Sequence, residues 1–283
     1  MDTVAQDRAM ELLGRFNDQL TSIVDDAFGS EWAEIEEILA LIALVADHVV
    51  TTRRLAELSG LNRRAISRLV ARLRSEGLVS TRHSDADGRV IEVVLTDHGE
   101  RQAAQFRTAI ADFFRRSRDL ALELSSGTGP VDTRMTQTLL DPIDLLRRVC
   151  EAGASLVAFM PDAATQGQLA ARQRAALVQI TTQHGVRPAD LSPSLGVSRA
   201  GAAYIVDQLC AKGFISRRHG AVDEDRRAVV LEATAEGIQA VRAVMDGIEH
   251  QQELLGHLFA EVAAWHQPPV KTGRSRPAVD QVG

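Results

Sequence analysis

The sequence predicts a mainly α-helical fold with small β-wings, built from two copies of one unit that long packing helices join. Three observations lead to this prediction. The chain has 283 residues, the length of roughly two ordinary domains. Apolar residues recur every three or four positions over most of the chain, as they do along helices. A pattern that begins at Gly60 returns at Gly196, which indicates an internal repeat.

The repeat is the strongest of these observations, because apolar, glycine and basic positions stay aligned over about 40 residues. We expect a first unit at residues 1–128, a second, divergent unit at 129–266 and a disordered tail at 267–283. The equivalent positions are Gly60 and Gly196, Asn62 and Ser198, Leu69 and Ile205, Gly77 and Gly213, and, after a two-residue insertion, Thr96 and Thr234.

The first unit shows an ordered series of local signals. A helix that is apolar on two faces, around residues 32–46, precedes a short helix at 52–59. Asn62 is placed to cap a helix at 63–76, which Gly77 ends. Two short strands follow, at 78–82 and 89–95, with an acidic turn between them. Helix, turn, helix and β-hairpin together predict a winged helix-turn-helix.

The second unit repeats this order, and its flanking segments carry a narrower apolar stripe. Ser198 caps a helix at 199–212, Gly213 ends it, and strands follow at 214–218 and 227–233. The stripes predict long helices that pack along one another, and residues 125–130 (SSGTGP) predict a linker. The stripes run from Phe106 to Leu124, from Leu139 to Met160 and from Ile238 to Val262, with a similar one from Leu13 to Ile23.

Composition excludes several classes of protein. Two cysteines, Cys150 and Cys210, cannot make a disulfide framework, and neither has an activating partner in sequence, so inert thiols are favoured. No signal-peptide layout and no apolar run of about 18 residues is present, so we expect a cytoplasmic protein without membrane association. Aromatic residues are 4% of the chain, which argues against a stacking platform for single strands.

Motifs for catalysis are absent as well. The sequence lacks a phosphate-binding glycine loop, a nucleophile elbow and a complete calcium loop. His250 and His257 could share a helix face, but two histidines without carboxylate partners do not make a metal site. We therefore expect no enzyme activity, no cofactor and no metal.

The distribution of charge is more informative than its sum. The chain has a net charge of −6, yet residues 53–89 carry nine arginines against four acidic residues, a local charge of +5. Residues 199–227 carry six basic residues against four acidic ones, a local charge of +2. Two basic patches on an acidic body are the pattern expected of a protein that binds nucleic acid at defined places.

Residues 55–70 (LAELSGLNRRAISRLV) resemble the helix-turn-helix of MarR-type transcriptional regulators. Residues 74–79, the acidic turn before Arg89 and residues 95–99 are similar to that family's helix end, wing and exit helix, and the second unit resembles them more loosely. Family members are homodimers of shorter chains joined by their terminal helices. The resemblance therefore implies a single-chain pseudo-dimer, either monomeric or paired as a homodimer of pseudo-dimers, whose partners are double-stranded DNA and a possible small-molecule effector.

The first unit offers a clear set of candidate DNA-binding residues. In the helix at 63–76, one face is apolar, and the opposite face holds Arg64 and Arg68 with Ser67 beside them. Arginine grips guanine in the major groove by two hydrogen bonds, so these residues are candidates for base reading. Those expected at phosphate or in the minor groove, at helix starts and on the wing, are Arg53, Arg54, Asn62, Arg63, Arg82 and Arg89.

The second unit departs from this pattern at the positions that matter. The equivalents of Arg64, Arg68 and Ala71 are Ala200, Tyr204 and Asp207, and a carboxylate repels phosphate. Gly201 within the helix and Pro193 within the preceding helix weaken the unit further. We expect unequal heads, with the second one limited to backbone and minor-groove contacts. Its candidate DNA-binding residues are Ser198, Arg199, Tyr204, Arg217, Arg218, Arg226 and Arg227.

These observations favour a DNA-binding transcriptional regulator, more often a repressor, that a small-molecule ligand releases. Trp32, Phe106 and Ile110 are candidates for the lining of the pocket that the resemblance implies, although ordinary core packing is favoured for each. Two other interpretations stay open: a structural protein whose tandem winged helices bind proteins, as in chromosome-organising accessory factors, and a ligand sensor whose heads are vestigial.

Overall fold

A computed structural model describes residues 3–28, 35–127, 141–159, 169, 171–183, 185–195, 197–219 and 229–265. The first half of the chain begins with helices α1 (Thr3–Phe28) and α2 (Ile35–Asp47). A winged helix-turn-helix follows, and helices α5 and α6 close the half. Its elements are strand β1 (Val49–Thr51), helices α3 (Thr52–Ser59) and α4 (Arg63–Ser75), strands β2 (Val79–His83) and β3 (Ile91–Leu95), and helices α5 (Asp97–Arg116) and α6 (Arg118–Gly127).

The second half repeats this order of elements with one strand fewer. Helix α7 corresponds to α1, α9 to α2, and α10 and α11 to α3 and α4. The bounds are α7 (Pro142–Val157), α9 (Ala171–Gln183), α10 (Pro188–Ser194), α11 (Arg199–Ala211), β4 (Ile215–His219), β5 (Val229–Ala233), α12 (Ala235–His250) and α13 (Gln252–Ala264).

The sheets confirm the duplication and also show its drift. In the first half, β3 lies between β1 and β2 in an antiparallel sheet, with Val50 opposite Val93. In the second half, β4 pairs with β5, and the equivalent of β1 is reduced to a single bridge between Val186 and Leu231. The predicted strands therefore form, each displaced by one or two residues from its expected start.

The two wings are joined to the next helix in the same way. Thr96 and Thr234 each cap that helix with the side-chain oxygen, and each hydroxyl also donates to a glycine carbonyl, at 2.6 Å and 2.7 Å. A Cβ on Gly99 would lie 2.0 Å from the Leu78 carbonyl oxygen, and one on Gly237 would meet the Phe214 oxygen at 2.2 Å. Only glycine permits this close approach of helix to wing.

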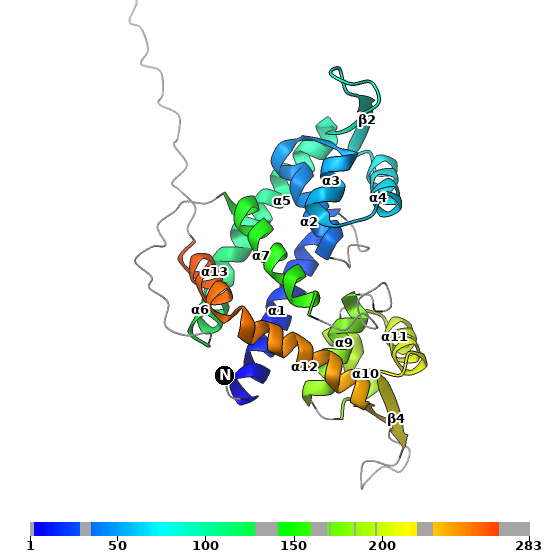
Figure 1. The fold of residues 1–283 in the computed structure, drawn as a ribbon, viewed down its shortest axis with the longest axis vertical. Helices are drawn as coiled ribbons and strands as arrows, with labels where there is room; N and C mark the ends of the chain where they lie inside the picture. The colour runs from blue at the N-terminus through cyan, green and yellow to red at the C-terminus, as the bar shows by residue number, and fades with distance from the viewer. Residues whose placement is uncertain are drawn as a thin grey trace, which may run out of the picture.

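Figure 1 shows the two winged heads at opposite ends of a central helical body. Helices α6 and α13, one from each half, pack along each other, and the first helix of each half also reaches the other half, α1 against α12 and α7 against α5 and α2. The Phe16 ring of α1 lies 5.2 Å from the Phe259 ring of α13. The chain is therefore a single-chain pseudo-dimer whose interface is an internal core.

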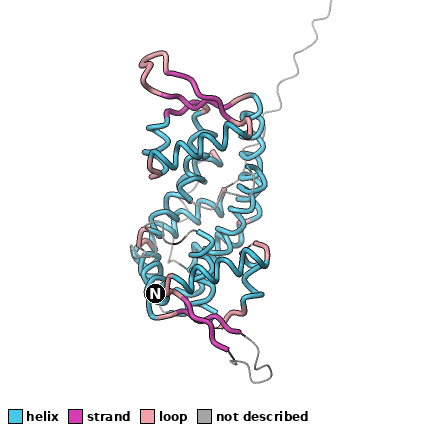
Figure 2. Tube along the Cα trace, turned by 90° about the vertical axis from the view of Figure 1, so that its right-hand side faces the viewer, coloured by secondary structure: helices cyan, strands magenta, loops and turns pink. Residues whose placement is uncertain are grey.

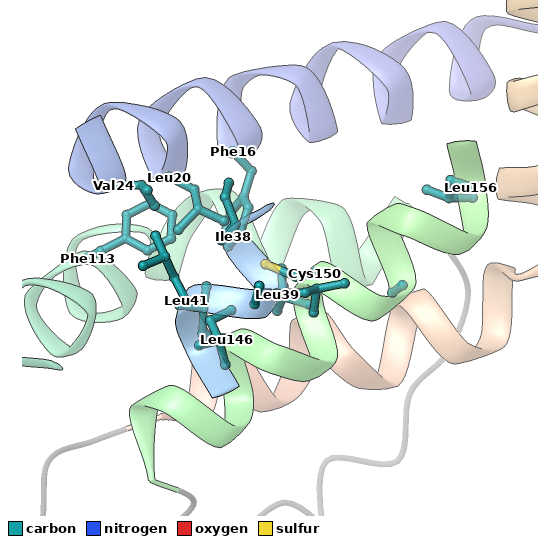
Figure 3. Close-up of a cluster of buried hydrophobic side chains, with 14 of the residues drawn as sticks. Phe16, Leu20, Val24, Ile38, Leu39, Leu41, Phe113, Leu146, Cys150 and Leu156 are labelled. Atoms are coloured by element: carbon teal, nitrogen blue, oxygen red, sulfur yellow. The ribbon is translucent and has the colours of Figure 1, made fainter. Parts of the chain in front are cut away.

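The wings project at the two ends of the elongated body, and α4 and α11 lie along the same side of it (Figures 1 and 2). One hydrophobic cluster runs from the first head through the body to the second. Figure 3 shows part of it, with Phe16, Leu20 and Val24 of α1 directed toward α2 and α7.

Several local expectations differ from the structure. The long terminal helices are each broken, at Ser117 between α5 and α6 and at Gln251 between α12 and α13. Gly201 lies in the first turn of α11, where its N–H bonds the Ser198 cap, so it does not interrupt the helix. Pro193 lies at the end of the seven-residue α10 rather than near its start.

The boundary expected at residues 128–129 and the tail at 267–283 lie outside the described residues. Among the helices that are described, none is both long and apolar enough to cross a bilayer.

Candidate nucleic-acid interface

Helix α4 is held by its ends and by its buried face. The Asn62 side chain accepts a hydrogen bond from the Ala65 N–H at 3.0 Å, and Gly77, at φ 71°, turns the chain out of the helix. The buried residues are the four that the apolar pattern predicts: Ile66, Leu69, Val70 and Leu73. Arg72 reaches Glu37 of α2 at 3.5 Å and ties the helix to the body. These contacts fix which side of α4 faces solvent.

The opposite face of α4 presents three arginines to solvent. Arg63, Arg64 and Arg68 are exposed, and none of them is in an ion pair within the described part of the chain. Ser67 is exposed beside them, and its hydroxyl donates to the Arg63 carbonyl oxygen at 2.9 Å. The predicted direction of Arg64 and Arg68 is therefore confirmed.

Three other arginines of the first head have partners on the protein. Arg53 bonds Glu57 at 2.9 Å, and Arg54 lies 3.6 Å from the same carboxylate. Arg82 of the wing bonds Glu92 at 2.9 Å. Arg89 is exposed at the wing tip. A phosphate would have to compete with these carboxylates at Arg53, Arg54 and Arg82. It would meet no such competition at the exposed Arg63, Arg64 and Arg68.

The second head presents a different surface at the same place. Ser198 caps α11, Arg199 and Ala200 are exposed, and the Tyr204 side chain is 63% exposed. Asp207 forms an ion pair with Arg217 of strand β4 at 2.5 Å. This pair occupies both the carboxylate of α11 and the nearest arginine of the wing.

Arg218 is also paired, with Glu232 at 2.8 Å. Arg226 and Arg227 lie outside the described residues. The supporting helix has changed in parallel, because Arg53 and Arg54 correspond to Ala189 and Asp190, both exposed. Within the described residues, the surface that is strongly cationic on the first head therefore has a net charge close to zero on the second.

A cavity of about 460 Å³ lies between the second head and the body. Its wall combines apolar residues of α1, α2, α7, α12 and α13 with polar residues of α1, α9 and α10, among them Gln179 and Ser194. Phe106 and Ile110 do not line it, because both are fully buried in the core, and Trp32 lies outside the described residues. Phe106 and Ile110 therefore belong to the core, which was the favoured interpretation of both residues.

Cys150 lies at the cavity wall but is 1% exposed, and burial raises the pKa of its thiol to about 12. Burial also raises the pKa of Cys210. Both shifts disfavour the reactive thiolate, in agreement with the expectation of inert thiols. Within the described residues, no three histidine, cysteine or acidic side chains gather as a metal site.

Comparison with known proteins gives a family for both halves. Two sequence models of the MarR family match, one at residues 37–90 and the other at residues 169–229. The transcriptional repressor MprA of Escherichia coli K12 is 39% identical over 72 residues, which are 25% of this chain and 40% of that repressor. The chain thus spans less than half the length of this curated relative.

Solved structures with a similar outline include the transcriptional regulator PA4135, at 17% identity and a TM-score of 0.31, over 35% of this chain and 74% of that one. A MarR variant from E. coli complexed with operator DNA is 20% identical, with a TM-score of 0.30, over 41% of this chain and 79% of its own.

Both family matches fall on a winged head, one in each half, and each begins in the helix that precedes the helix-turn-helix or just before it. The chain therefore carries two MarR-family domains in tandem.

Proposed function

We propose that this chain is a cytoplasmic transcriptional regulator that reads duplex DNA with its first head, by placing α4 in the major groove. The observation that carries this proposal is the solvent-facing set of Arg63, Arg64 and Arg68, which no carboxylate of the described chain neutralises. Arg64 and Arg68 have the chemistry for guanine, whereas Arg63, at the helix start, suits a phosphate. Arg89 at the wing tip suits the minor groove.

The second head contributes weakly to this binding. Among the described residues, the outward face of α11 offers one arginine, Arg199, and Asp190 and Asp207 are exposed on the same head. Arg217 and Arg218 are engaged by carboxylates, so contact with phosphate would first have to break two ion pairs. Because one head binds strongly and the other weakly, we expect the DNA site to have two unequal half-sites, which is an imperfect palindrome.

Repression is the direction of regulation that we favour, since a protein seated on a promoter blocks access to it. The repressor MprA, similar over 72 residues, supports this direction. Release by a small molecule is supported by the cavity of about 460 Å³, a size that suits a drug-like ligand. A ligand there would change how the second head sits against α1.

The test selects a DNA site from a random pool with the full chain and then measures affinity by fluorescence anisotropy. The double variant Arg64→Ala, Arg68→Ala should lose roughly 5- to 150-fold in affinity for the selected site per arginine that contacts a base, and should no longer prefer it over random DNA. Non-specific affinity should fall less, because phosphate contacts by other residues remain.

Tyr204→Ala is the matched control, because Tyr204 occupies on the second head the position of Arg68 on the first. It should change affinity for the selected site by less than about threefold, within the usual range for surface substitutions. Equal losses from the two changes, or a double variant that keeps its preference, would refute reading by the first head alone.

A further inference from the structure

The sequence explains why the cavity forms. The explanation becomes visible when equivalent helices of the two halves are compared. Helix α2 packs against α7 with Ile38, Leu39 and Ile42, all buried. The equivalent residues of α9 are Arg174, Ala175 and Val178. Two of these side chains are smaller, and Arg174 directs its guanidinium to the Leu169 carbonyl oxygen at 2.7 Å. All three line the cavity.

The helix across the cavity shows the same contrast. On α7, Cys150 is 1% exposed, and a Cβ on Gly153 would lie 2.8 Å from the Ile35 side chain of α2, so the two helices are in close contact here although these residues also reach the cavity wall. The equivalent residues of α1 are Gly14 and Asn17, which are exposed and line the cavity. The contact that is closed in the first half is therefore open in the second, so the pseudo-twofold is broken at this point.

The open space holds an acidic group that no cation offsets. Asp18 of α1 lines the cavity and makes no hydrogen bond or ion pair within the described residues. The other charged groups of the wall are Glu11, which is paired with Arg8, Arg174, which bonds a carbonyl oxygen, and Arg15. The Asp18 side chain is exposed to solvent, but partial desolvation raises its pKa to about 6, with no opposing contribution from either arginine.

We propose that the two halves have divided the work, so that the first reads DNA and the second holds one effector site per chain, which prefers a small hydrophobic cation such as an aryl amine. The apolar wall from α1, α7 and α13 takes the hydrophobic part, and the Asp18 carboxylate takes the ammonium group. The effect of the ligand on DNA binding rests on the proposed function, whereas binding of the ligand itself can be measured without DNA.

Helix α1 is the physical link between this site and the reading head. Its middle lines the cavity, while its end packs on α5: the Phe28 and Phe106 rings are 5.1 Å apart, and the Gln102 amide donates to the Ala27 carbonyl oxygen. Arg172 of α9 also reaches Asp25 of α1, at 3.4 Å. A ligand wedged between α1 and α9 therefore acts on the helix that supports the first head.

The test uses three probes of one shape: 2-naphthylmethylammonium, 2-naphthylmethanol and 2-naphthoate, titrated into the full chain at pH 7.5 with calorimetry. We expect one ammonium bound per chain, about tenfold tighter than the alcohol, and the carboxylate weakest. Asp18→Asn should remove the tenfold advantage and leave the alcohol unchanged, an effect of the size expected for a partly exposed charged hydrogen bond.

A second variant tests the location independently of charge. Ala175→Leu places in α9 the residue that α2 has at the equivalent position and should weaken all three probes at least tenfold, with cooperative thermal unfolding as the check on folding. Two bound probes per chain, an ammonium no tighter than naphthoate, or unaltered binding in both variants would overturn the proposal. Affinity for the selected DNA is measured separately by fluorescence anisotropy. The binding of the three probes can therefore be interpreted even if the chain proves not to read DNA.

Discussion

Arg68 and Tyr204 occupy the same position on two helices of the same origin, and both side chains point to solvent. The surrounding apolar residues are kept in both helices, Leu69 and Val70 in one and Ile205 and Val206 in the other, and all four are buried. Packing has therefore kept the buried face apolar in both helices, whereas the exposed face of α11 has lost the positive charge that Arg68 provides on α4. A few side-chain changes on the exposed face of an equivalent helix separate a surface that attracts phosphate from one that does not.

Asp18→Asn should stabilise the protein at pH 8 and not at pH 4. Partial desolvation raises the pKa of Asp18 from 3.8 to about 6, so the folded state binds this proton more tightly than the unfolded state. The contribution of Asp18 to stability is therefore full below pH 3.8 and is lost as the pH rises through 6. The other charged groups at the cavity wall beside Asp18 are Glu11, Arg15 and Arg174. Melting temperatures at the two pH values measure the effect, and an equal shift at both would contradict it.

Ala175→Leu should also raise stability in the absence of any ligand, by about 0.5–2 kcal/mol, because it fills apolar space that the chain leaves open. Leu39→Ala, the reverse change at the equivalent position of α2, should cost about 2–5 kcal/mol, because Leu39 is buried against α7. Urea unfolding of both variants measures the pair. A loss of stability in Ala175→Leu would show that the second half is packed as closely as the first.

At the scale of elements, the wing is joined closely to the helix after it. In each half the threonine cap bonds back to the glycine that ends the preceding helix, and the next helix begins against a carbonyl oxygen of the chain entering the wing. The link between head and body is therefore short and close-packed in both halves.

Gly99→Ala tests this link. The new Cβ would lie 2.0 Å from the Leu78 carbonyl oxygen, so α5 must move away from the wing at a cost of about 1–3 kcal/mol. Gly14→Ala is the matched control, because nothing lies within 4 Å of its Cβ position and alanine favours a helix by about 0.5–1 kcal/mol. Thermal unfolding should show opposite signs, and a loss at Gly14 would mean that α1 is more tightly packed than described.

The elements and their caps could be predicted from the sequence, since apolar spacing, Asn62, Ser198 and the glycines act locally. The breaks at Ser117 and Gln251 could not, because the apolar stripe continues across both and the bend follows from packing between halves. The outward face of α4 followed from its periodicity. Pairs such as Asp207 with Arg217 join a helix to a strand and need the fold.

The cavity needed the fold as well, although its signal was present in the sequence. Comparing α2 with α9 position by position reveals the loss of bulk at Ala175 and Val178. The repeat thus provided an internal reference, and its informative positions are those where the two copies disagree.

At the scale of the whole molecule, two heads project from one helical body, but within the described residues the first head carries most of the unpaired positive charge. Arg63 and Arg199 stand at equivalent positions at the starts of α4 and α11, and both are exposed. They allow the contribution of each head to DNA binding to be measured with matched changes.

Arg63→Ala should reduce the slope of log affinity against log salt by about 0.9, the loss of one phosphate contact, and Arg199→Ala should reduce the slope by clearly less. A hydroxyl-radical footprint should show one strongly protected segment of about one helical turn rather than two equal ones. Equal slopes for the two variants, with two equal protected segments, would indicate that both heads engage DNA alike.

The covalent connection of the halves has a consequence for dosage. A regulator assembled from separate subunits falls apart when its cellular amount drops below the dissociation constant of the pair. Here α6 and α13 belong to one polypeptide, so their encounter is intramolecular and does not depend on how many copies a cell holds. Even a few molecules per cell would keep both halves assembled, and a gene that encodes this chain can be expressed sparingly without losing its product's architecture.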